Sequence, residues 1–160
     1  MQSAEQILMI LALGLFAIFQ LNNNIASGSR EIGTINNETV IAGTAIAQSM
    51  INEIKSKAFD EKTVSQYVPL PNSLTSIDSL GRDPDEYYYT NYDDIDDYNN
   101  HQRTESVGRL GEFHTLVKVY YVKLSPIRIS TVRTFVKEVD VSVFNSTLTD
   151  TLKFKQFVAY

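Results

Sequence analysis

The chain has 160 residues, about one domain's worth, and 43% of them are hydrophobic, so it can bury one modest core. It has no cysteine, which excludes a disulfide framework, a thiolate metal site and a cysteine nucleophile, and only two histidines, which exclude a histidine-rich metal site. The formal net charge of −5 makes it a poor general binder of nucleic acid.

The charges are divided unevenly along the chain. Residues 1–106 hold 6 basic and 15 acidic side chains, a balance of −9, and residues 107–160 hold 8 and 4, a balance of +4; the two sums return −5. An ordinary solvated surface explains this division. The alternative interpretation is that copies of the chain attract each other, acidic region against basic region.

The most informative stretch is an apolar run near the N-terminus, residues 7–19, thirteen residues without a polar side chain. No basic residue precedes it, unlike a secretory signal peptide. It is shorter than the roughly 20 residues of a transmembrane helix. If residues 1–6 also entered a bilayer, Glu5 would be carried into an apolar medium, where a lone carboxylate costs several kcal/mol. Glu5 therefore needs a cationic partner, and the nearest is an α-amino group, its own or a neighbour's.

Residues 25–59 continue in a helical register, with Glu53 expected on the exposed side. One apolar stripe recurs at steps of mostly three and four residues: Ile32, Ile35, Val40, Gly43, Ile46, Met50 and Ile54. Three asparagines and several glycines and serines predict a soft middle at roughly residues 20–34. A helix of about 58 residues would span about 87 Å. A domain of this size cannot cover that length, so a membrane or other subunits must bury its first part.

Residues 61–112 predict a long, irregular connection, interrupted by Pro69 and Pro71. Within it, residues 85–100 carry five tyrosines and six acidic side chains. We expect the tyrosines to pack this loop onto the sheet or onto a neighbour; binding of sugars or bases is the alternative. The tyrosines are Tyr87, Tyr88, Tyr89, Tyr92 and Tyr98.

Residues 113–160 predict three antiparallel strands. Residues 116–122 are rich in β-formers, and Val139, Val141 and Val143 alternate with polar neighbours. Leu152 and Phe154 alternate with lysines in the last stretch. Such a meander can cover the apolar stripe of the helix with one face.

Three motifs together resemble the type IV pilin and type II secretion pseudopilin family. The first is an apolar N-terminal helix with glutamate at its fifth position, on which Met1, Glu5 and Gly14 match the family's positions. The second is the helix end at residues 47–60, alanine-rich and closing on Phe59-Asp60. The third is the run at residues 92–98, Tyr-Asp-Asp-Ile-Asp-Asp-Tyr.

The resemblance implies a structural subunit. Met1 would be the first residue after cleavage by a prepilin peptidase and would then be N-methylated. Glu5 would pair with a neighbouring subunit's N-terminal amine, and Gly14 would lie in a flexible region of the helix. The subunit would wait in the inner membrane and then join copies of itself in an extracellular helical pilus, with the pilus assembly machinery as a further partner and no specific nucleic acid.

Several alternatives stay open. Within the family, a minor pilin or pseudopilin would prime or cap such a filament, in the periplasm if it is a pseudopilin. Outside it, the chain would be a monomeric, membrane-anchored periplasmic binding domain that uses the loop for ligand. An uncleaved signal anchor would give Glu5 no special role. Capture of DNA by the basic strands rests on the +4 balance alone. Adhesion, motility, secretion and DNA uptake are not distinguished.

No nucleophile elbow, phosphate-binding loop or dinucleotide fingerprint occurs, so we predict no enzyme and no catalytic residue. Closely spaced oxygen ligands suit Ca²⁺, which makes calcium the one candidate cofactor, in a loop expected to be solvated. Its ligands would be Asp93, Asp94, Asp96 and Asp97. Asn145 begins a glycosylation motif in a predicted turn and is the more accessible of two such motifs.

The predicted fold class is α+β, a long N-terminal helix packed on a small antiparallel sheet. The expected divisions are a hydrophobic helix for the membrane or filament core at residues 1–24 and its amphipathic half at residues 25–60. The acidic, tyrosine-rich connecting loop at residues 61–112 and the sheet at residues 113–160 follow.

Overall fold

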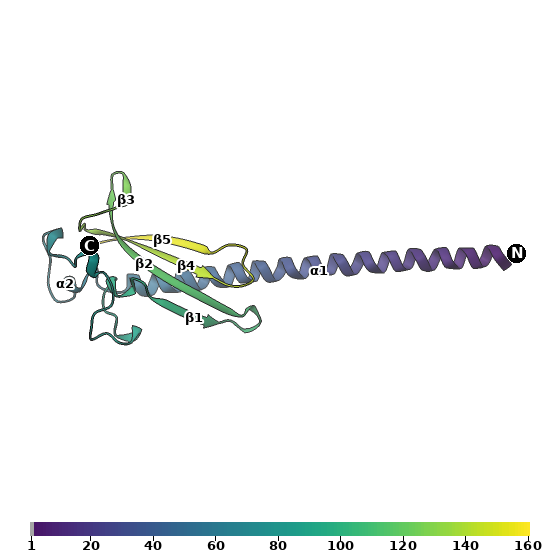
Figure 1. Ribbon diagram of the computed structural model, residues 1–160, viewed down its shortest axis with the longest axis horizontal. Helices are drawn as coiled ribbons and strands as arrows, with labels where there is room; N and C mark the ends of the chain where they lie inside the picture. The colour runs from purple at the N-terminus through teal and green to yellow at the C-terminus, as the bar shows by residue number, and fades with distance from the viewer. Residues whose placement is uncertain (1) are drawn as a thin grey trace. The chain divides into compact units, whose positions relative to one another are not determined.

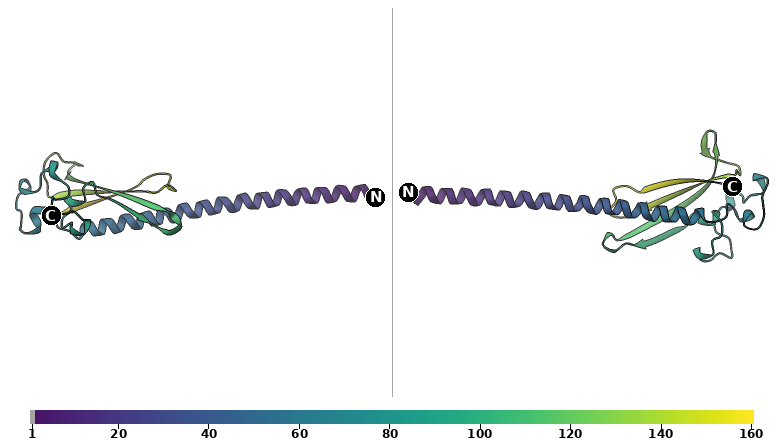
Figure 2. Two further views of the ribbon diagram at one scale, coloured as in Figure 1. Left: turned by 60° about the horizontal axis from the view of Figure 1, so that its bottom comes forward. Right: turned by 180° about the vertical axis from the view of Figure 1, so that it is seen from behind.

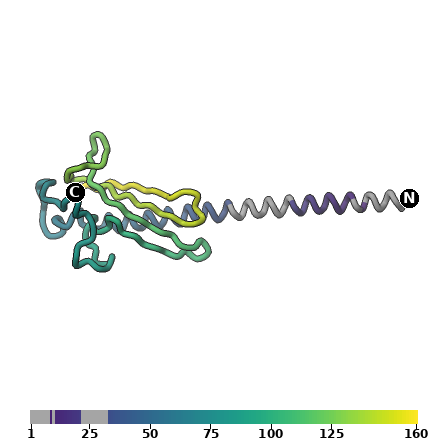
Figure 3. The backbone as a smooth tube through the Cα atoms, viewed as in Figure 1, coloured from purple at the N-terminus to yellow at the C-terminus, as the bar shows by residue number. Residues whose placement is uncertain are grey.

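The structure is a computed structural model. It describes the backbone of residues 2–160 and the side chains of residues 9, 11–21 and 33–160 (Figure 3). The chain divides into two compact units, Met1–Glu38 and Thr39–Tyr160, and each is described by itself. The predicted soft middle of the helix, roughly residues 20–34, falls largely outside the described side chains and stays a prediction.

The elements follow one another as a long helix, a set of short turns and a sheet. The helices are α1 at Gln2–Lys55 and α2 at Glu61–Val64. The strands are β1 at Gln102–Ser106, β2 at Glu112–Leu124, β3 at Ile127–Ile129, β4 at Val136–Phe144 and β5 at Leu152–Ala159. Short 3-10 helices lie at Pro71–Ser73, Ile77–Ser79, Tyr89–Asn91, Asp96–Tyr98 and Gly108–Leu110.

The second unit is a helix on an antiparallel sheet, which confirms the predicted α+β class. The sheet order is β1-β2-β4-β5, and β3 pairs with the far end of β2 as a hairpin. In Figure 1 the hairpin stands away from the other strands, and the end of α1 runs along the sheet. Figure 2 shows the helix on one face of the sheet in both of its views.

The core lies between that face and residues 39–55 of α1. Val139, Val141 and Val143 point into it, as their alternation predicts, and all three are buried. The helix face differs from the predicted stripe, since Val40 is exposed and Thr39 is buried in its place. Thr39 is the first buried position among the described helix residues, and the second unit begins there. The buried helix side chains of the hydrophobic core are Ala47, Met50, Ile51 and Ile54.

Two strands were not expected, β1 and the short β3. β1 lies inside the stretch predicted as a connection, because its sequence Gln-Arg-Thr-Glu-Ser has no apolar residue to give a strand pattern. β1 is held in strand conformation by pairing with β2. In this register Gln102 lies opposite Leu116 and Ser106 lies opposite Glu112. The pairing continues backwards, since the amide of Asn100 donates to the carbonyl of Val117 at 2.9 Å.

Gly43 is the point where the helix comes closest to the sheet. A Cβ at this position would lie 2.8 Å from Leu152 Cδ1, 3.4 Å from Phe113 Cε1 and 3.6 Å from Val143 Cγ1. The absence of a side chain therefore sets the distance between the helix and strands β2, β4 and β5. Only the end of the Leu152 side chain would have to shift for a methyl group.

We expect Gly43→Leu to lower the free energy of unfolding by about 1–3 kcal/mol, because it overpacks this contact. Gly43→Ala should be nearly neutral, since alanine's helix propensity, better by about 1 kcal/mol, offsets a small shift of Leu152. Urea unfolding of the full chain, followed by a probe of the sheet, measures both. Gly33→Leu is the control, because nothing lies within 4 Å of a Cβ built there. Equal stability of the two leucine variants would contradict the close approach.

Candidate functional site

The described part of the first unit presents a band of large apolar side chains to solvent. Each of eight such residues between positions 9 and 21 is 56–66% exposed. They are Met9, Leu11, Leu13, Leu15, Phe16, Ile18, Phe19 and Leu21. Gly14 lies within this apolar band and has no heavy atom within 4 Å of its Cβ position.

The apolar band goes all the way round the helix. At 100° per residue its eight side chains leave no sector wider than about 80° unoccupied. A helix that is apolar on every side requires an apolar environment on every side. Covering eight such side chains is worth on the order of 10–20 kcal/mol in transfer free energy. The described residues of this chain leave them uncovered.

The two residues that the resemblance places at the assembly contact lie outside this description. Met1 is not among the described residues, and the side chain of Glu5 is not among the described side chains. Processing and methylation of Met1 and pairing of Glu5 stay predictions.

In the second unit, the chain that leaves α1 is organised around Asp60. Its Oδ1 accepts from the amide of Lys62 at 3.2 Å and caps α2, and both of its carboxylate oxygens accept from the amide of Thr75, at 3.1 and 3.0 Å. The hydroxyl of Tyr121 donates to Oδ2 at 2.8 Å. Asp60 is fully buried, so these bonds fix the path of the chain after the helix.

A fully buried lysine on β4 faces this carboxylate. The Lys137 ammonium donates to the carbonyl of Phe59 at 2.6 Å, to Asp60 Oδ2 at 3.1 Å and to Asp96 Oδ1. It also lies 4.5 Å from the ring centre of Phe59 and 5.1 Å from that of Tyr121. One cation thus joins the helix end, the central sheet and the acidic loop.

The two carboxylates share this cation unequally. Burial raises the pKa of Asp60, but the charge of Lys137 and the hydrogen bonds from Tyr121 and Lys137 outweigh it, so the pKa lies below its ordinary value. Burial raises the pKa of Asp96 to about 7, and Lys137 offsets only part of that effect. Asp60 is therefore the more firmly ionised partner.

Most of the aspartate run is buried rather than solvated, which corrects the expectation from sequence, and only Asp93 of the four is exposed. Asp94, Asp96 and Asp97 are all buried. Asp97 Oδ2 accepts from the amides of Asp93 and Asp94 at 3.1 and 3.2 Å, and the amide of Asp97 donates to Asp94 Oδ1 at 3.1 Å. Burial, followed by the charges of Asp96 and Asp97, raises the pKa of Asp94 to about 8.

The four aspartates do not converge on one cation position. Asp96 is engaged by Lys137, and Asp94 caps a turn. Among the described residues, carboxylate oxygens of Glu86, Asp93 and Asp97 do lie within 4.8 Å of one another. Three oxygens are fewer than the six to eight ligands of Ca²⁺. Calcium stays a prediction, with Glu86 in place of Asp94 and Asp96.

The far end of the loop is fastened to α1 by a second ion pair. Arg103 donates to both carboxylate oxygens of Glu53 at 3.0 Å, and the hydroxyl of Tyr98 donates to Glu53 Oε1 at 2.8 Å. Glu53 is thus a structural partner of the loop, and its expected place on the exposed side of the helix was wrong. Arg103 also lies 4.7 Å from the ring centre of Tyr89.

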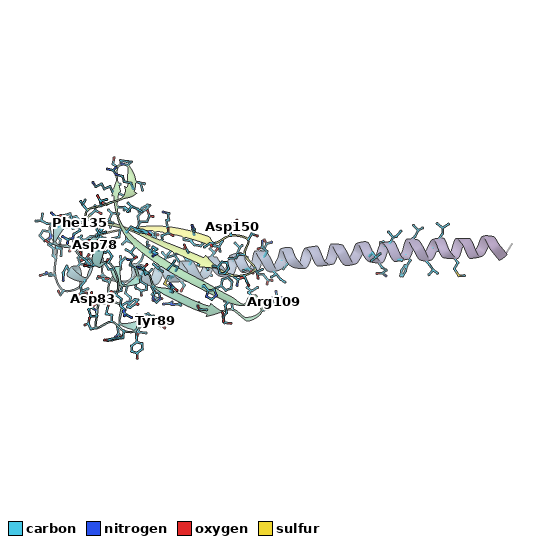
Figure 4. All side chains as sticks on the ribbon, viewed as in Figure 1. Asp78, Asp83, Tyr89, Arg109, Phe135 and Asp150 are labelled. Atoms are coloured by element: carbon cyan, nitrogen blue, oxygen red, sulfur yellow. The ribbon has the colours of Figure 1, made fainter. Side chains whose placement is uncertain are left out.

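The tyrosines divide into two groups. Tyr92 and Tyr98 are buried and meet edge to face with ring centres 5.1 Å apart, as expected of residues that pack the loop. Tyr87, Tyr88 and Tyr89 are exposed. Figure 4 labels Tyr89 at the edge of the second unit, and its ring lies beside Arg103 and His101.

Asn145 is not an accessible glycosylation site. It is fully buried, its Nδ2 donates to the carbonyls of Leu110 and Glu112 at 2.9 Å, and its Oδ1 accepts from the amide of Thr147 at 2.8 Å. A glycan on that nitrogen would replace one of its two hydrogens and so break one of the donated bonds, and the buried site leaves it no space. The asparagine is in a turn, as predicted, but it serves as the turn's internal hydrogen-bonding group.

Sequence reasoning missed Lys137 and Glu86. A signal for Lys137 existed, because it has the same parity as Val139, Val141 and Val143 and therefore points into the core. A lysine at such a position requires buried carboxylate partners. No pattern in the sequence predicts that Glu86 is buried, since it lies in a loop without the periodicity of a helix or strand.

Comparisons of the chain with protein-family models, with curated proteins and with solved structures found no match. In the part of the chain whose side chains are described, no helix has the length and apolar character needed to cross a membrane.

We expect Lys137→Met to lower the free energy of unfolding by about 3–5 kcal/mol, because it leaves Asp60 and Asp96 buried without their cation. Urea unfolding of the full chain measures the change. Lys153→Met is the control on the same sheet, since the Lys153 side chain is exposed on β5. A loss no larger than that of the control would show that the buried cation does not organise the loop.

The raised pKa values of Asp94 and Asp96 predict a pH dependence of stability. Both pKa values lie above the ordinary value near 4, so the folded state binds more protons than the unfolded state and stability falls as pH rises through about 7–8. The lowered pKa of Asp60 acts in the opposite sense, and its contribution is lost as the pH falls below about 4. The decline begins above about pH 4, where the unfolded carboxylates ionise, and ends at about pH 8, so stability should be greatest near pH 4.

Thermal unfolding in EDTA from pH 4.5 to 9 tests this, because the chelator removes divalent cations that would alter these carboxylates. Asp94→Asn should flatten the decline between pH 4.5 and 8, because the folded and unfolded states differ in bound protons over that interval. A midpoint that rises over this interval would contradict the assigned directions.

Proposed function

We propose that this chain is a structural subunit of a type IV pilus-like extracellular filament, which polymerises through its N-terminal helix. The observation that carries the proposal is the apolar band, which surrounds the helix and is left uncovered by the described residues of its own chain. Identical helices packed side by side cover one another's apolar surfaces on every side, and a lipid bilayer does so before assembly.

The second unit supports the same proposal because its core is already buried within one chain. Its own apolar stripe is covered by its own sheet, so it needs no partner to bury its core. One unit of the chain buries its own apolar surface, and the N-terminal helix leaves its apolar surface exposed. This combination suits a polymer in which the helices form the core and the folded units lie outside it. Glu5 and Met1 would then set the axial register, as the resemblance implies, after processing by a prepilin peptidase at the inner membrane.

The alternative within the class is a minor pilin or pseudopilin that primes or caps the filament. The helix end at Phe59-Asp60 and the acidic loop favour it by resemblance. Position in the filament distinguishes the two roles. Immunogold labelling along the whole length indicates a major subunit, and labelling at the tip indicates a minor one.

Glu5→Ala should abolish filament assembly while the second unit folds normally. Glu5 precedes the apolar band, where an unpaired charge is costly, so removing it deprives a neighbour's N-terminal ammonium of its partner. Loss of one member of a buried pair costs about 3–5 kcal/mol. Filament yield by electron microscopy and near-ultraviolet circular dichroism of the purified chain measure assembly and folding separately.

Glu112→Ala is the matched control, since the Glu112 side chain is exposed on the second unit. Glu53 is unsuitable because it is bonded to Arg103 and Tyr98. Normal filament yield from Glu5→Ala would refute the proposed role of Glu5. Loss of the folded second unit as well would assign Glu5 a structural task instead.

A further inference from the structure

The hairpin of β2 and β3 exposes apolar side chains that the rest of the second unit does not cover. Leu124, Ile127 and Ile129 are 57–63% exposed. The same hairpin places Lys123 directly opposite Arg128, and both are exposed. We call residues 123–129 the hairpin tip. Two like charges at directly paired positions repel each other, and residues 122–133 contain no acidic side chain to relieve them.

The acidic loop offers the complementary surface. Tyr87, Tyr88 and Tyr89 are 50–73% exposed, and Asp85 beside them is also exposed. We call residues 85–89 the tyrosine patch. Residues 85–97 contain no basic side chain, although Arg82 lies 5.9 Å from the ring centre of Tyr87 and Arg103 lies 4.7 Å from that of Tyr89. Asp85 is the exposed carboxylate of the patch, since Glu86 is buried. A cavity of about 430 Å³, lined by Tyr89, His101 and the residues of β1 from Gln102 to Glu105, opens next to the patch and has room for an aliphatic side chain.

The hairpin tip and the tyrosine patch lie on opposite sides of the second unit. Figures 1 and 4 place β3 beyond one side of the sheet and Tyr89 beyond the other. One copy therefore cannot satisfy its own hairpin tip with its own patch.

We propose that the hairpin tip of one copy docks on the tyrosine patch of a second copy. The aliphatic side chains would pack on the tyrosine rings and in the cavity beside Tyr89, and Lys123 and Arg128 would approach Asp85 and its acidic neighbours. Tyrosine supplies a large apolar area with a polar end, which suits such contacts. Opposite charge on the two surfaces fixes the orientation and disfavours tip-to-tip pairing.

Such a contact uses two different surfaces, so it is heterologous and leaves a free tip and a free patch at the ends of every oligomer. It therefore propagates instead of closing as a dimer. Its place within a filament rests on the proposed function, but the contact itself belongs to the second unit and can be measured without filaments.

The chain has no cysteine, so introduced cysteines report on single positions. Full-length chain carrying both Ile127→Cys and Tyr88→Cys, purified in detergent that coats the apolar band, is treated with a short bismaleimide. The contact predicts a ladder of oligomers from the double variant. A mixture of the two single variants should stop at a dimer. Ile127→Cys paired with Asp150→Cys, an exposed position on the loop before β5, is the matched control and should give no ladder.

Charge reversal provides the second arm. Arg128→Glu should reduce the ladder several-fold, and Asp85→Arg added to it should restore the yield. Equal yields from the Asp85→Arg single variant, the reversed pair and the parent would show that charge does not orient the contact and would overturn the proposal. Absence of a ladder over the tested concentration range, or a ladder equal to that of the Asp150 control, would also overturn it.

These outcomes are separate from those of the proposed function. If Glu5→Ala leaves filament yield normal while the ladder forms, the contact stands and the role of the N-terminal helix fails. If filaments depend on Glu5 and no ladder forms, the filament proposal stands and the contact between hairpin tip and tyrosine patch fails.

Discussion

The ammonium of Lys137 is the interaction on which the second unit depends. It lies in the core, where an uncompensated charge is very costly, so every element that contributes an oxygen to it is fixed in place. Those elements are the chain after α1, through Phe59 and Asp60, and the acidic loop, through Asp96. Segments 41 and 77 residues away from Lys137 in sequence are thereby joined at the centre of the sheet. A buried ion pair is weak evidence for high stability but fixes one arrangement over others.

The two units differ in whether their apolar side chains are buried within the chain. In the second unit, Gly43 lets helix and sheet approach closely, and the apolar face of the helix is buried within one chain. In the first, the apolar band between Met9 and Leu21 is exposed on all sides. Its transfer free energy is gained only in contact with other molecules. The apolar surface of the second unit is thus satisfied within one chain, and under the proposed function the apolar band is covered by other copies.

Periodicity was sufficient to predict the helix, the three longer strands and the inward face of β4, because each depends on local apolar spacing. It failed where order comes from distant partners. β1 has no apolar residue and exists because β2 offers it a free edge. The aspartate run has the composition of a solvated loop, yet Asp96 is drawn inward by a lysine 41 residues later. Asn145 matched a surface motif, but that motif carries no information about burial.

The buried contacts of the acidic loop determine which of its side chains remain exposed. Asp96 is bound to Lys137, Tyr98 is bound to Glu53, and Tyr92 packs on Tyr98, so the loop is anchored at its second half. Asp85 and Tyr87–Tyr89 remain exposed beside this anchored half, while Glu86 between them is buried. Arg103, which is bonded to Glu53, lies against the Tyr89 ring. The hairpin of β2 and β3 extends the same strand, β2, that pairs with the lysine-bearing β4. Tip and patch are thus tied to one rigid sheet, and a repeating contact between copies requires such fixed spacing.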